Sequence, residues 1–264
     1  MKTYRYVLLD PTGNLTCLVL DPADSGDEAA LVRELLKQCE QVAFLEPPKR
    51  PEAAAGIRLM GGEFCGNAAM AAAVWLIRDE MEEGAEKTLL LEVSGAAEPV
   101  LCTVRKTADG FEGTVCMPGI PEISTEILCG IPFSVIRMEG IVHLICENRT
   151  FAPEEAEKLL LRLAEQLPDE AAGLLQWDRE ARHMKPLVYV RGSGSLVWEH
   201  GCGSGSAAVG AMEALRSGAK QTTVSVNQPG GSIRAAAETE DGAITAVSIT
   251  GRIRIGEENS IVIH

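Results

Sequence analysis

The residues of this sequence that are best suited to chemistry are two cysteines in matching contexts. Cys65 stands in the sequence FCGNAA, and Cys202 stands in GCGSGSAA, 137 positions later. Solenoid repeats recur roughly every 20 to 50 residues, so a spacing of about half the chain indicates a duplicated domain. In both copies the cysteine follows an extended run and precedes an alanine-rich segment, at 68–77 and at 207–215. We predict that both segments are helices and that Gly218 is the C-cap of the second.

This placement puts each cysteine at a helix N-terminus, where unpaired backbone N–H groups and the helix dipole stabilise an anion. A thiolate is such an anion, and the pKa of a cysteine, about 8.5 when free, falls at such sites. We therefore expect a useful fraction of both thiols to be ionised at neutral pH. The glycines that follow, Gly66 and Gly203, leave the backbone amides open to a ligand, so a substrate carboxylate can bind there.

Two thiols that act on one substrate suit one reaction in particular. One sulfur removes the proton of an α-carbon and the other delivers a proton to the opposite face, which inverts the centre by two-base transfer. The backbone donors stabilise the negative charge that grows on the carboxylate as the carbanion forms. This reaction requires no metal and no other cofactor, and we expect none.

Two other interpretations of the motifs stay open. A Cys-Gly pair before an alanine-rich helix can serve close packing alone, although the paired occurrence argues against this. Residues 203–208, GSGSAA, also fit the dinucleotide-binding pattern G-x-G-x-x-A between a strand and a helix. That pattern requires an acidic residue about 20 positions later. Because residues 221–228 contain none, dinucleotide binding is the weaker interpretation.

The composition is that of a globular protein that does not bind nucleic acid. The chain has 264 residues, 46% hydrophobic and 23% charged, which is enough for one large or two medium domains. Its net charge of −14 repels phosphate backbones and anionic membrane surfaces. The longest apolar run, 68–77, is too short to span a bilayer, and the N-terminus lacks the pattern of a signal peptide. We expect a cytoplasmic protein without nucleic-acid or membrane partners.

The other cysteines show no metal-binding spacing. The chain has eight cysteines but no C-x-x-C pair, which argues against a structural zinc site and against a thioredoxin-like motif. In a reducing compartment they are expected as thiols. Because free cysteine is among the most buried residue types, we predict that the remaining six are buried packing residues: Cys17, Cys39, Cys102, Cys116, Cys129 and Cys146.

Apolar periodicity and turn residues predict an α+β chain with two similar halves. In the first half we expect helices at 28–40 and 68–77 and strands at 4–9, 16–20, 41–45, 89–93 and 100–104. In the second half we expect helices at 153–167 and 207–215 and strands at 134–137, 142–146, 187–190, 196–199, 222–226, 232–236 and 244–249, followed by a last pair of strands within 251–263.

A cluster of turn residues marks the joint between the halves: Pro118, Gly119, Pro121, Gly130 and Pro132. We therefore place an N-terminal half with the Cys65 motif at 1–120, joined by the last strand at about 254–264. The C-terminal half with the Cys202 motif is placed at 121–253.

With these motifs the sequence resembles the diaminopimelate epimerase family, whose members are cofactor-independent racemases and epimerases with two catalytic cysteines. Among its members, the chain resembles the histidine racemase type more than diaminopimelate epimerase proper. The resemblance runs in order along the whole chain: TGN at 12–14, QVAFLE at 41–46, EFCGN at 63–67, GIVH at 140–143, WEHG at 198–201, CGSG at 202–205, PGG at 229–231 and ITG at 249–251.

This resemblance implies a diaminopimelate epimerase-like fold. It has two pseudo-symmetric domains, each a curved and mostly antiparallel sheet around a central helix, with the active site between them. It also implies that Cys65 and Cys202 are the catalytic acid and base. The carboxylate would be held by four backbone amides: those of Gly66, Asn67, Gly203 and Ser204.

The resemblance assigns further polar side chains to the site. Asn14 and Gln41 match positions that contact the substrate. His143 and Glu199 match auxiliary residues that orient or tune the catalytic thiols. His200 stands where the family has an arginine that binds the substrate.

The sequence departs from the family where the distal charged end of diaminopimelate would bind. Ile141 and Met60 take the places of two asparagines, and Lys185-Pro186 replaces an asparagine pair. The segment that usually separates the glutamate from the second cysteine is absent, so Glu199 is three residues from Cys202. A charged head needs charge-assisted hydrogen bonds, worth roughly 1.5 to 3 kcal/mol each, and apolar replacements leave it unpaired.

We therefore predict an isomerase, a PLP-independent amino-acid racemase whose best single substrate candidate is histidine. Glu46 or Glu199 would face its imidazole. Diaminopimelate epimerase proper is the first alternative, and isomerases without a second thiol fit less well. A non-catalytic protein that binds an amino acid or a dinucleotide is the alternative from another class. The expected partner is a small-molecule amino-acid substrate, and a homodimer stays open.

Overall fold

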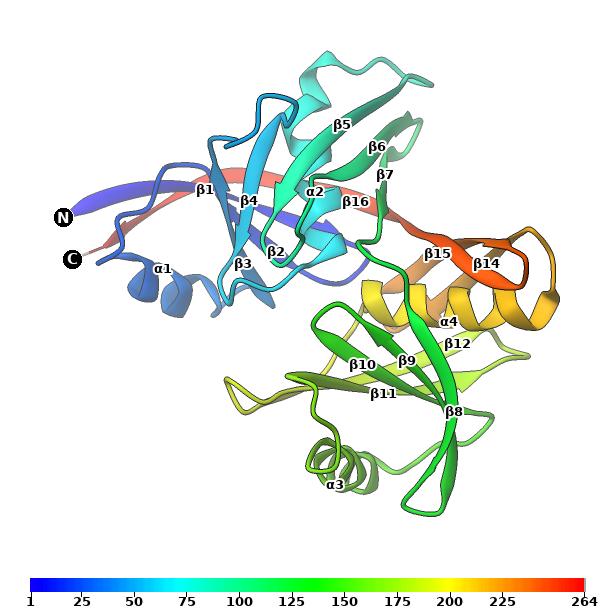
Figure 1. Ribbon diagram of the computed structural model, residues 1–264. Coiled ribbons are helices and arrows are strands. Elements are labelled where there is room, and N and C mark those ends of the chain that lie inside the picture. Colours follow the sequence, from blue (N-terminus) through cyan, green and yellow to red (C-terminus); the bar gives the residue numbers. More distant parts are fainter. Residues whose placement is uncertain (264) are drawn as a thin grey trace. The chain divides into compact units, whose positions relative to one another are not determined.

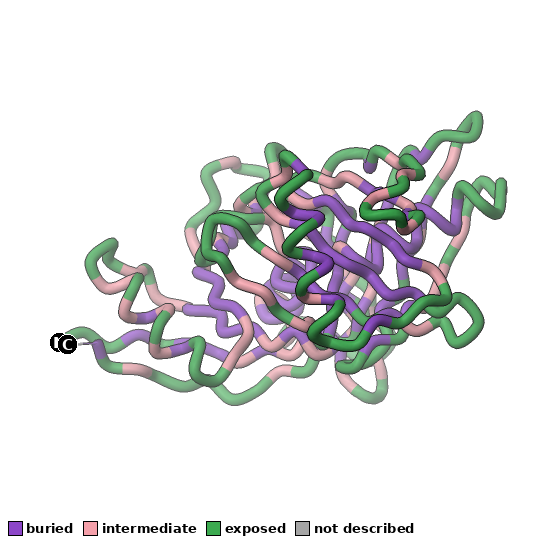
Figure 2. The backbone as a smooth tube through the Cα atoms, turned by 90° about the horizontal axis from the view of Figure 1, so that it is seen from below, coloured by how far each residue is buried: buried purple, intermediate pink, exposed green. Residues whose placement is uncertain are grey.

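A computed structural model describes residues 1–263 of the chain. They form two compact units: unit 1 comprises residues 1–118 and the C-terminal segment from Thr250, and unit 2 comprises Gly119–Ile249. The fold is mixed α+β, with few helices and many strands that pair mostly antiparallel (Figure 1), which confirms the predicted fold class. Figure 2 shows buried residues along the strands and helices and exposed residues along the turns that connect them.

Unit 1 is a closed ring of strands with a helix packed against it. Its elements are β1 (Lys2–Pro11), β2 (Thr16–Val19), α1 (Glu28–Leu35), β3 (Gln41–Glu46), β4 (Ala55–Leu59), α2 (Gly66–Ile77), the 3-10 helix η1 (Arg78–Glu80), β5 (Glu86–Val93), β6 (Val100–Thr107), β7 (Gly110–Cys116) and the last part of β16 (Ala243–Ile263). The strands pair in the order β1 to β7 and then β16, and β1 pairs with β16 as well, which closes the ring. Helix α2 contacts strands on all sides of this ring.

Helix α2 keeps its place because its residues are small, apolar and buried on every side. Every residue from Gly66 to Trp75 is buried. Alanine is the best helix former, and a helix that is apolar all round belongs inside a core. Gly113 of β7 lets the helix approach closely, since a Cβ at this position would lie 2.8 Å from Cβ of Met70. The core of unit 1 therefore sets the position of Cys65, directly before α2.

Unit 2 is an open sheet with a helix on each face. Its elements are β8 (Glu122–Leu128), β9 (Ile131–Met138), β10 (Ile141–Glu147), α3 (Pro153–Ala164), β11 (Ala171–Asp178), β12 (His183–Val190), β13 (Ser195–Trp198), α4 (Gly203–Ser217), β14 (Gln221–Gln228), β15 (Gly231–Glu240) and the first part of β16. The strands pair in the order β16, β15, β14, β12, β11, β10, β9, β8, with β13 beside β12.

The two helices of unit 2 lie on opposite sides of its strands (Figure 1), and each packs in an apolar cluster of its own. Leu160 and Leu163 of the amphipathic helix α3 pack against Leu174 and Leu187 on one side of the sheet. Val209 and Met212 of α4 pack in the cluster that contains Cys202. Gly218 ends α4 in the left-handed conformation, with φ 65° and ψ 8°, which confirms the predicted C-cap. No helix within residues 1–263 is long and apolar enough to cross a membrane.

Two helices are shorter than their apolar patterns predict. Helix α1 ends at Leu35 rather than at residue 40, because the chain turns there to enter β3, and the Glu40 N–H donates to the Leu15 carbonyl at 2.8 Å. Helix α3 ends at Ala164 rather than at residue 167. There the Arg191 guanidinium donates to the carbonyls of Ala164 and Leu167, at 2.6 and 3.0 Å, and so takes the place of further helical bonds.

Periodicity also misses strands β4, β7, β8 and β11. In β7 two of the seven residues are glycines, which hide the alternation that the burial pattern shows. Two further expectations are wrong, one about the last strands and one about the joint between the halves. Residues 251–263 continue the single long strand β16 instead of forming a pair, because they are the antiparallel partner of β1. Gly130 lies in the tight turn between β8 and β9, and Pro132 is the second residue of β9, so neither belongs to a joint between the halves. Gly130 has the positive φ of 75° that this turn requires.

The prediction of six buried packing thiols is wrong for two of them. Cys17, Cys102 and Cys146 are buried, and Cys39 is half-buried. Burial raises the pKa of Cys102 to about 12, as expected for a packing thiol. Cys116 is exposed because it ends β7 on the outward side of the alternating pattern, and Cys129 is exposed because it lies in the β8–β9 turn.

The contact between α4 and β15 yields a stability prediction. A Cβ on Gly210 would lie 2.6 Å from Cβ of Ala235, closer than two methyl groups can approach. Gly→Ala inside a helix normally stabilises by roughly 1 kcal/mol. Here we expect Gly210→Ala to destabilise the protein by about 1 to 3 kcal/mol through overpacking, measured by urea unfolding.

The matched control removes the Cβ of Ala235 on β15, which makes room for the added Cβ at position 210. The double variant Gly210→Ala, Ala235→Gly should recover part of the loss, with the Ala235→Gly single variant as its reference. A Gly210→Ala variant as stable as the parent protein would show that the helix can move away from β15 without cost.

Candidate active site

Cys65 occupies the N-cap position of α2. Its backbone is extended, with φ −135° and ψ 110°, and its side chain is half-buried. The segment before it is held by Ser94, whose hydroxyl accepts from the Leu59 N–H at 2.9 Å and donates to the Glu63 carbonyl at 2.8 Å. Gly95, with φ 76°, leaves room for this segment, since a Cβ there would lie 2.3 Å from the Phe64 nitrogen.

Four of the predicted site residues gather around one amide oxygen in unit 1. Oδ1 of Asn14 accepts hydrogen bonds from Nε2 of Gln41 at 2.7 Å and from Nδ2 of Asn67 at 3.3 Å, and lies 4.0 Å from Sγ of Cys65. Asn14, Gln41 and Asn67 are all buried. Their side chains are therefore fixed beside the thiol rather than free in a turn.

Two further residues complete this cluster, and sequence reasoning missed both. Nδ2 of Asn14 donates to the Glu40 carboxylate at 2.9 Å, and Nε2 of Gln41 donates to the Thr16 hydroxyl at 2.8 Å. Thr16 is the partner of Gln41 in the pairing of β2 with β3, and Glu40 directly precedes β3. Their contacts with Gln41 and Asn14 depend on this strand pairing, which the sequence alone does not show.

Cys202 occupies the equivalent N-cap position of α4 in unit 2. Its backbone is extended, with φ −93° and ψ 108°, and the residue is 3% exposed. Its Sγ accepts the Gly205 N–H at 3.3 Å and lies 3.7 Å from the Ser204 hydroxyl. The predicted N–H donors of the helix terminus are therefore directed at the sulfur.

The pKa of Cys202 nevertheless moves in the direction opposite to the expected one. Burial is the largest cause and raises this pKa well above its ordinary value, and the Glu199 carboxylate, which hydrogen bonds to the thiol, raises it further. The Gly205 N–H and the Ser204 hydroxyl act in the lowering direction but are weaker. Cys202 is therefore a neutral thiol at neutral pH, and Glu199 contacts it despite the short connecting segment.

His143 reaches the same thiol through Ser204. The imidazole is fully buried on β10, and its Nε2 lies 3.0 Å from the Ser204 hydroxyl oxygen. Burial lowers the pKa of His143 to about 3, so the ring is neutral at physiological pH. Gly173 of β11 makes room for the ring, since a Cβ there would lie 2.4 Å from Nδ1. Gly173 carries no sequence signal of its own.

The remaining predicted residues are the two glycines that follow the cysteines, His200 and Glu46. Gly66 and Gly203 are the first residues of α2 and α4, which begin two and four residues earlier than the predicted starts at 68 and 207. The exposed His200 accepts the Gly230 N–H at its carbonyl at 2.7 Å. The Glu46 carboxylate pairs with the Arg58 guanidinium at 2.6 Å. Its expected contact with a substrate imidazole stays a prediction.

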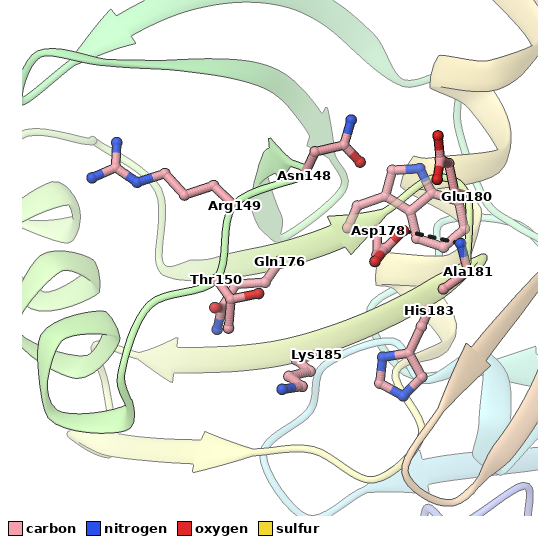
Figure 3. Close-up of a pocket in the computed structure, with 10 residues that line it drawn as sticks. Asn148, Arg149, Thr150, Gln176, Asp178, Glu180, Ala181, His183 and Lys185 are labelled. Carbon is pink, nitrogen blue, oxygen red and sulfur yellow. Dashed lines mark hydrogen bonds between the residues drawn. The ribbon is translucent and has the colours of Figure 1, made fainter.

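Unit 2 also contains a cavity of about 620 Å³ at the ends of β10, β11 and β12. It is lined among others by Asn148, Arg149, His183 and Lys185 (Figure 3), and none of Cys202, His143 and Glu199 lines it. Arg149 and Asn148 extend in opposite directions in Figure 3, so the polar groups do not converge on one ligand atom. Within residues 1–263, no His, Cys, Asp and Glu side chains gather in a group that could hold a metal ion.

The chain is similar to known proteins along nearly its whole length. The profile of the histidine racemase CntK N-terminal domain family matches residues 3–261. A histidine racemase of Fusobacterium nucleatum subsp. nucleatum is 27% identical over 97% of this chain and 98% of its own. A diaminopimelate epimerase of Xanthomonas axonopodis pv. citri is 27% identical over 87% of both chains. The crystal structure of a probable proline racemase from Agrobacterium radiobacter superposes with TM-score 0.74 and 14% identity, covering 99% of this chain and 93% of the other.

The fold and the relatives define an isomerase of the racemase and epimerase class. Within that class, the chain belongs to the family of the histidine racemase CntK N-terminal domain. The resemblance to the diaminopimelate epimerase family, and to its histidine racemase type in particular, is thereby confirmed.

The contacts of Cys202 predict opposite effects for two substitutions. Glu199→Gln removes the negative charge beside the sulfur and should lower the pKa of Cys202. Ser204→Ala removes a hydrogen bond that favours the thiolate and should raise it. The pH midpoint of iodoacetamide modification at Cys202, followed by mass spectrometry, measures both shifts.

Glu157→Gln is the control, because that carboxylate accepts a hydrogen bond from the Trp198 indole at 2.9 Å in the same unit. It should leave the midpoint unchanged. Shifts of the same sign for Glu199→Gln and Ser204→Ala would contradict the assignment of these two contacts.

Proposed function

We propose that the protein is an amino-acid racemase that inverts the α-carbon by two-base proton transfer between Cys65 and Cys202. The observation that carries this proposal is the matched placement of the two thiols. Each is the N-cap of a buried helix made of small residues, in an extended backbone conformation. No other cysteine among the described residues stands at such a position.

The contacts of Cys202 support its role as the acid of the pair. Cys202, held neutral by burial and by Glu199, is ready to protonate a carbanion. Cys65 is then the base that removes the α-proton in the direction in which Cys202 is the acid. After one turnover the two thiols have exchanged roles, so the same pair serves the reverse reaction.

The helix termini supply the carboxylate site in this mechanism. The first N–H groups of an α-helix have no partner within the helix. In α4, the thiol takes the Gly205 N–H, and the side chain of Gln228 takes the Cys202 N–H. The amides between them, those of Gly203 and Ser204, are therefore the ones that we assign to a substrate carboxylate. Their dipoles would stabilise the charge that develops as the α-proton leaves.

His143 and Glu199 have complementary roles in this proposal. Glu199 accepts from the Cys202 thiol and so favours its protonated state. When Cys202 becomes a thiolate, the Ser204 hydroxyl can turn towards the sulfur while it accepts from Nε2 of the neutral His143. The two contacts thus support the two protonation states that Cys202 passes through.

Histidine is the substrate that we propose. The relatives named histidine racemase cover 80 to 97% of the chain. By the family resemblance, Ile141 and Met60 stand where the epimerases hold a charged distal head. Both proposed partners of the imidazole already have a contact, Glu46 with the Arg58 guanidinium and Glu199 with the Cys202 thiol, so either carboxylate would add the imidazole to its present partner. Diaminopimelate is the competing substrate, favoured by the relatives that carry the epimerase name.

We further propose that the two units are structural repeats. Each has a cysteine before a helix of small residues that packs against its sheet. Close packing also recurs, with Gly113 against Met70 in unit 1 and Gly210 against Ala235 in unit 2. A duplicated ancestor explains why one cysteine at a helix N-cap occurs in each unit.

Solvent exchange tests the reaction directly. In deuterated water with a panel of L-amino acids, we expect Cα deuterium incorporation and D-isomer formation with histidine and little with diaminopimelate. Mass spectrometry and chiral chromatography measure the two products. Exchange with diaminopimelate alone would replace histidine as the substrate, and no exchange with any amino acid would refute a racemase.

The thiols are tested one at a time. Cys65→Ala and Cys202→Ala should each lower the racemisation rate by roughly 100- to 10,000-fold, because one base cannot complete an inversion. Cys17→Ala and Cys146→Ala remove buried thiols of unit 1 and unit 2 and should retain activity once folded. Full activity of either N-cap variant would exclude the two-base mechanism.

A further inference from the structure

A closed ring of hydrogen bonds surrounds the backbone of Cys202. The Cys202 N–H donates to Oε1 of Gln228 at 2.7 Å, and Nε2 of Gln228 donates to the Ser206 hydroxyl at 2.9 Å. The Ser206 hydroxyl in turn donates to the Cys202 carbonyl at 2.7 Å. Gln228 is 5% exposed and Ser206 is fully buried, so water does not compete for these bonds.

This ring gives hydrogen-bond partners to both the N–H and the carbonyl of Cys202. The N–H of an N-cap residue has no intrahelical partner and needs one from outside when it is buried. Gln228, at the end of β14, supplies that partner from a different element of unit 2. The Cys202 backbone is thereby held from the strand side and from the first turn of α4 at the same time.

Fixing this backbone also fixes the thiol. With φ −93° and ψ 108°, Sγ of Cys202 lies within 3.3 Å of the Gly205 N–H and 3.7 Å from the Ser204 hydroxyl. Rotation about the Cys202 backbone would move the sulfur away from both donors. Gln228 itself makes no contact with a reacting atom in this arrangement, so its action passes through the peptide groups of Cys202.

Another glutamine of unit 2 shows what a purely structural role looks like. Gln176 is 4% exposed and accepts the Phe151 N–H at its Oε1 at 2.6 Å. Its residue type, burial and backbone contact match those of Gln228. Gln176 lies on β11 near the cavity of Figure 3, and none of its given contacts involves Cys202.

We propose that Gln228 is a positioning residue for the Cys202 thiol, acting with Ser206 through the backbone of Cys202. This inference rests on the proposed function, in which Cys202 exchanges a proton with the substrate. It goes beyond the assigned acid, base and carboxylate site, because it explains how the acid is kept in place.

The main test compares Gln228→Leu with Gln176→Leu in the full-length protein. Both variants lose a hydrogen bond to a buried backbone N–H. Gln228→Leu also loses the bond to Ser206, while Nε2 of Gln176 has no hydrogen-bond partner among the described residues, so Gln176→Leu should be the less destabilised variant in urea unfolding. Only Gln228→Leu should lower kcat for histidine racemisation, by about 10- to 100-fold, since a misplacement of about 1 Å in a catalytic group has effects of this size. KM should change little, because the substrate amides of Gly203 and Ser204 stay in the helix.

A second variant keeps the test decisive if Gln228→Leu does not fold. Ser206→Ala opens the same ring and should also lower kcat with little change of KM. Where both single variants fold, the double variant should be no slower than the slower single variant, since residues in one network are not additive. Independent, multiplicative effects would overturn a common ring.

The thiol itself provides a readout that does not depend on the racemase assignment. Gln228→Leu should move the pH midpoint of iodoacetamide modification of Cys202 upwards, as the sulfur loses the Gly205 N–H, and Gln176→Leu should not. If the parent protein exchanges no amino acid, the proposed function fails while this comparison still decides the role of Gln228. Equal kcat and equal midpoints for the two glutamine variants would overturn the inference.

Discussion

Both candidate catalytic thiols depend on the burial of a helix made of small residues. Helix α2 is buried along nearly its whole length, and α4 is buried along most of it. A slip of one residue would turn each helix by roughly 100°, and the close contacts at Gly113 and Gly210 prevent it. Each cysteine is the last extended residue before its helix, so the packed core fixes the backbone from which the thiol projects.

The environment of Cys202 shows which of two opposing effects prevails. A helix N-terminus stabilises a charge by about 0.3 to 1 kcal/mol at an exposed site and by up to about 2 kcal/mol in a partly buried one. Full burial can shift a pKa by about 3 to 5 units, at about 1.4 kcal/mol each. Burial and the Glu199 carboxylate therefore outweigh the Gly205 N–H and the Ser204 hydroxyl. The result suits an acid that must hold its proton until a carbanion forms.

Sequence reasoning succeeded where a signal is local. The Cys-Gly motifs, the helices after them and the Gly218 cap depend on neighbouring residues, and all appear in the structure. It failed where a partner far along the chain decides. Arg191 shortens α3 by donating to the carbonyls of Ala164 and Leu167. Cys129 is exposed because it lies in a turn, and only the pairing of β8 with β9 reveals that turn.

By itself the sequence determined the α+β class, the family and the two thiols, because these are written in composition, spacing and short motifs. Only the tertiary structure decided that Cys202 is a neutral thiol, that His143 reaches it through Ser204, and that Gln228 holds its backbone. Burial, hydrogen-bond partners and pKa all depend on which distant residues share a volume. Strand pairing and helix packing set that volume, and no short stretch of sequence contains it.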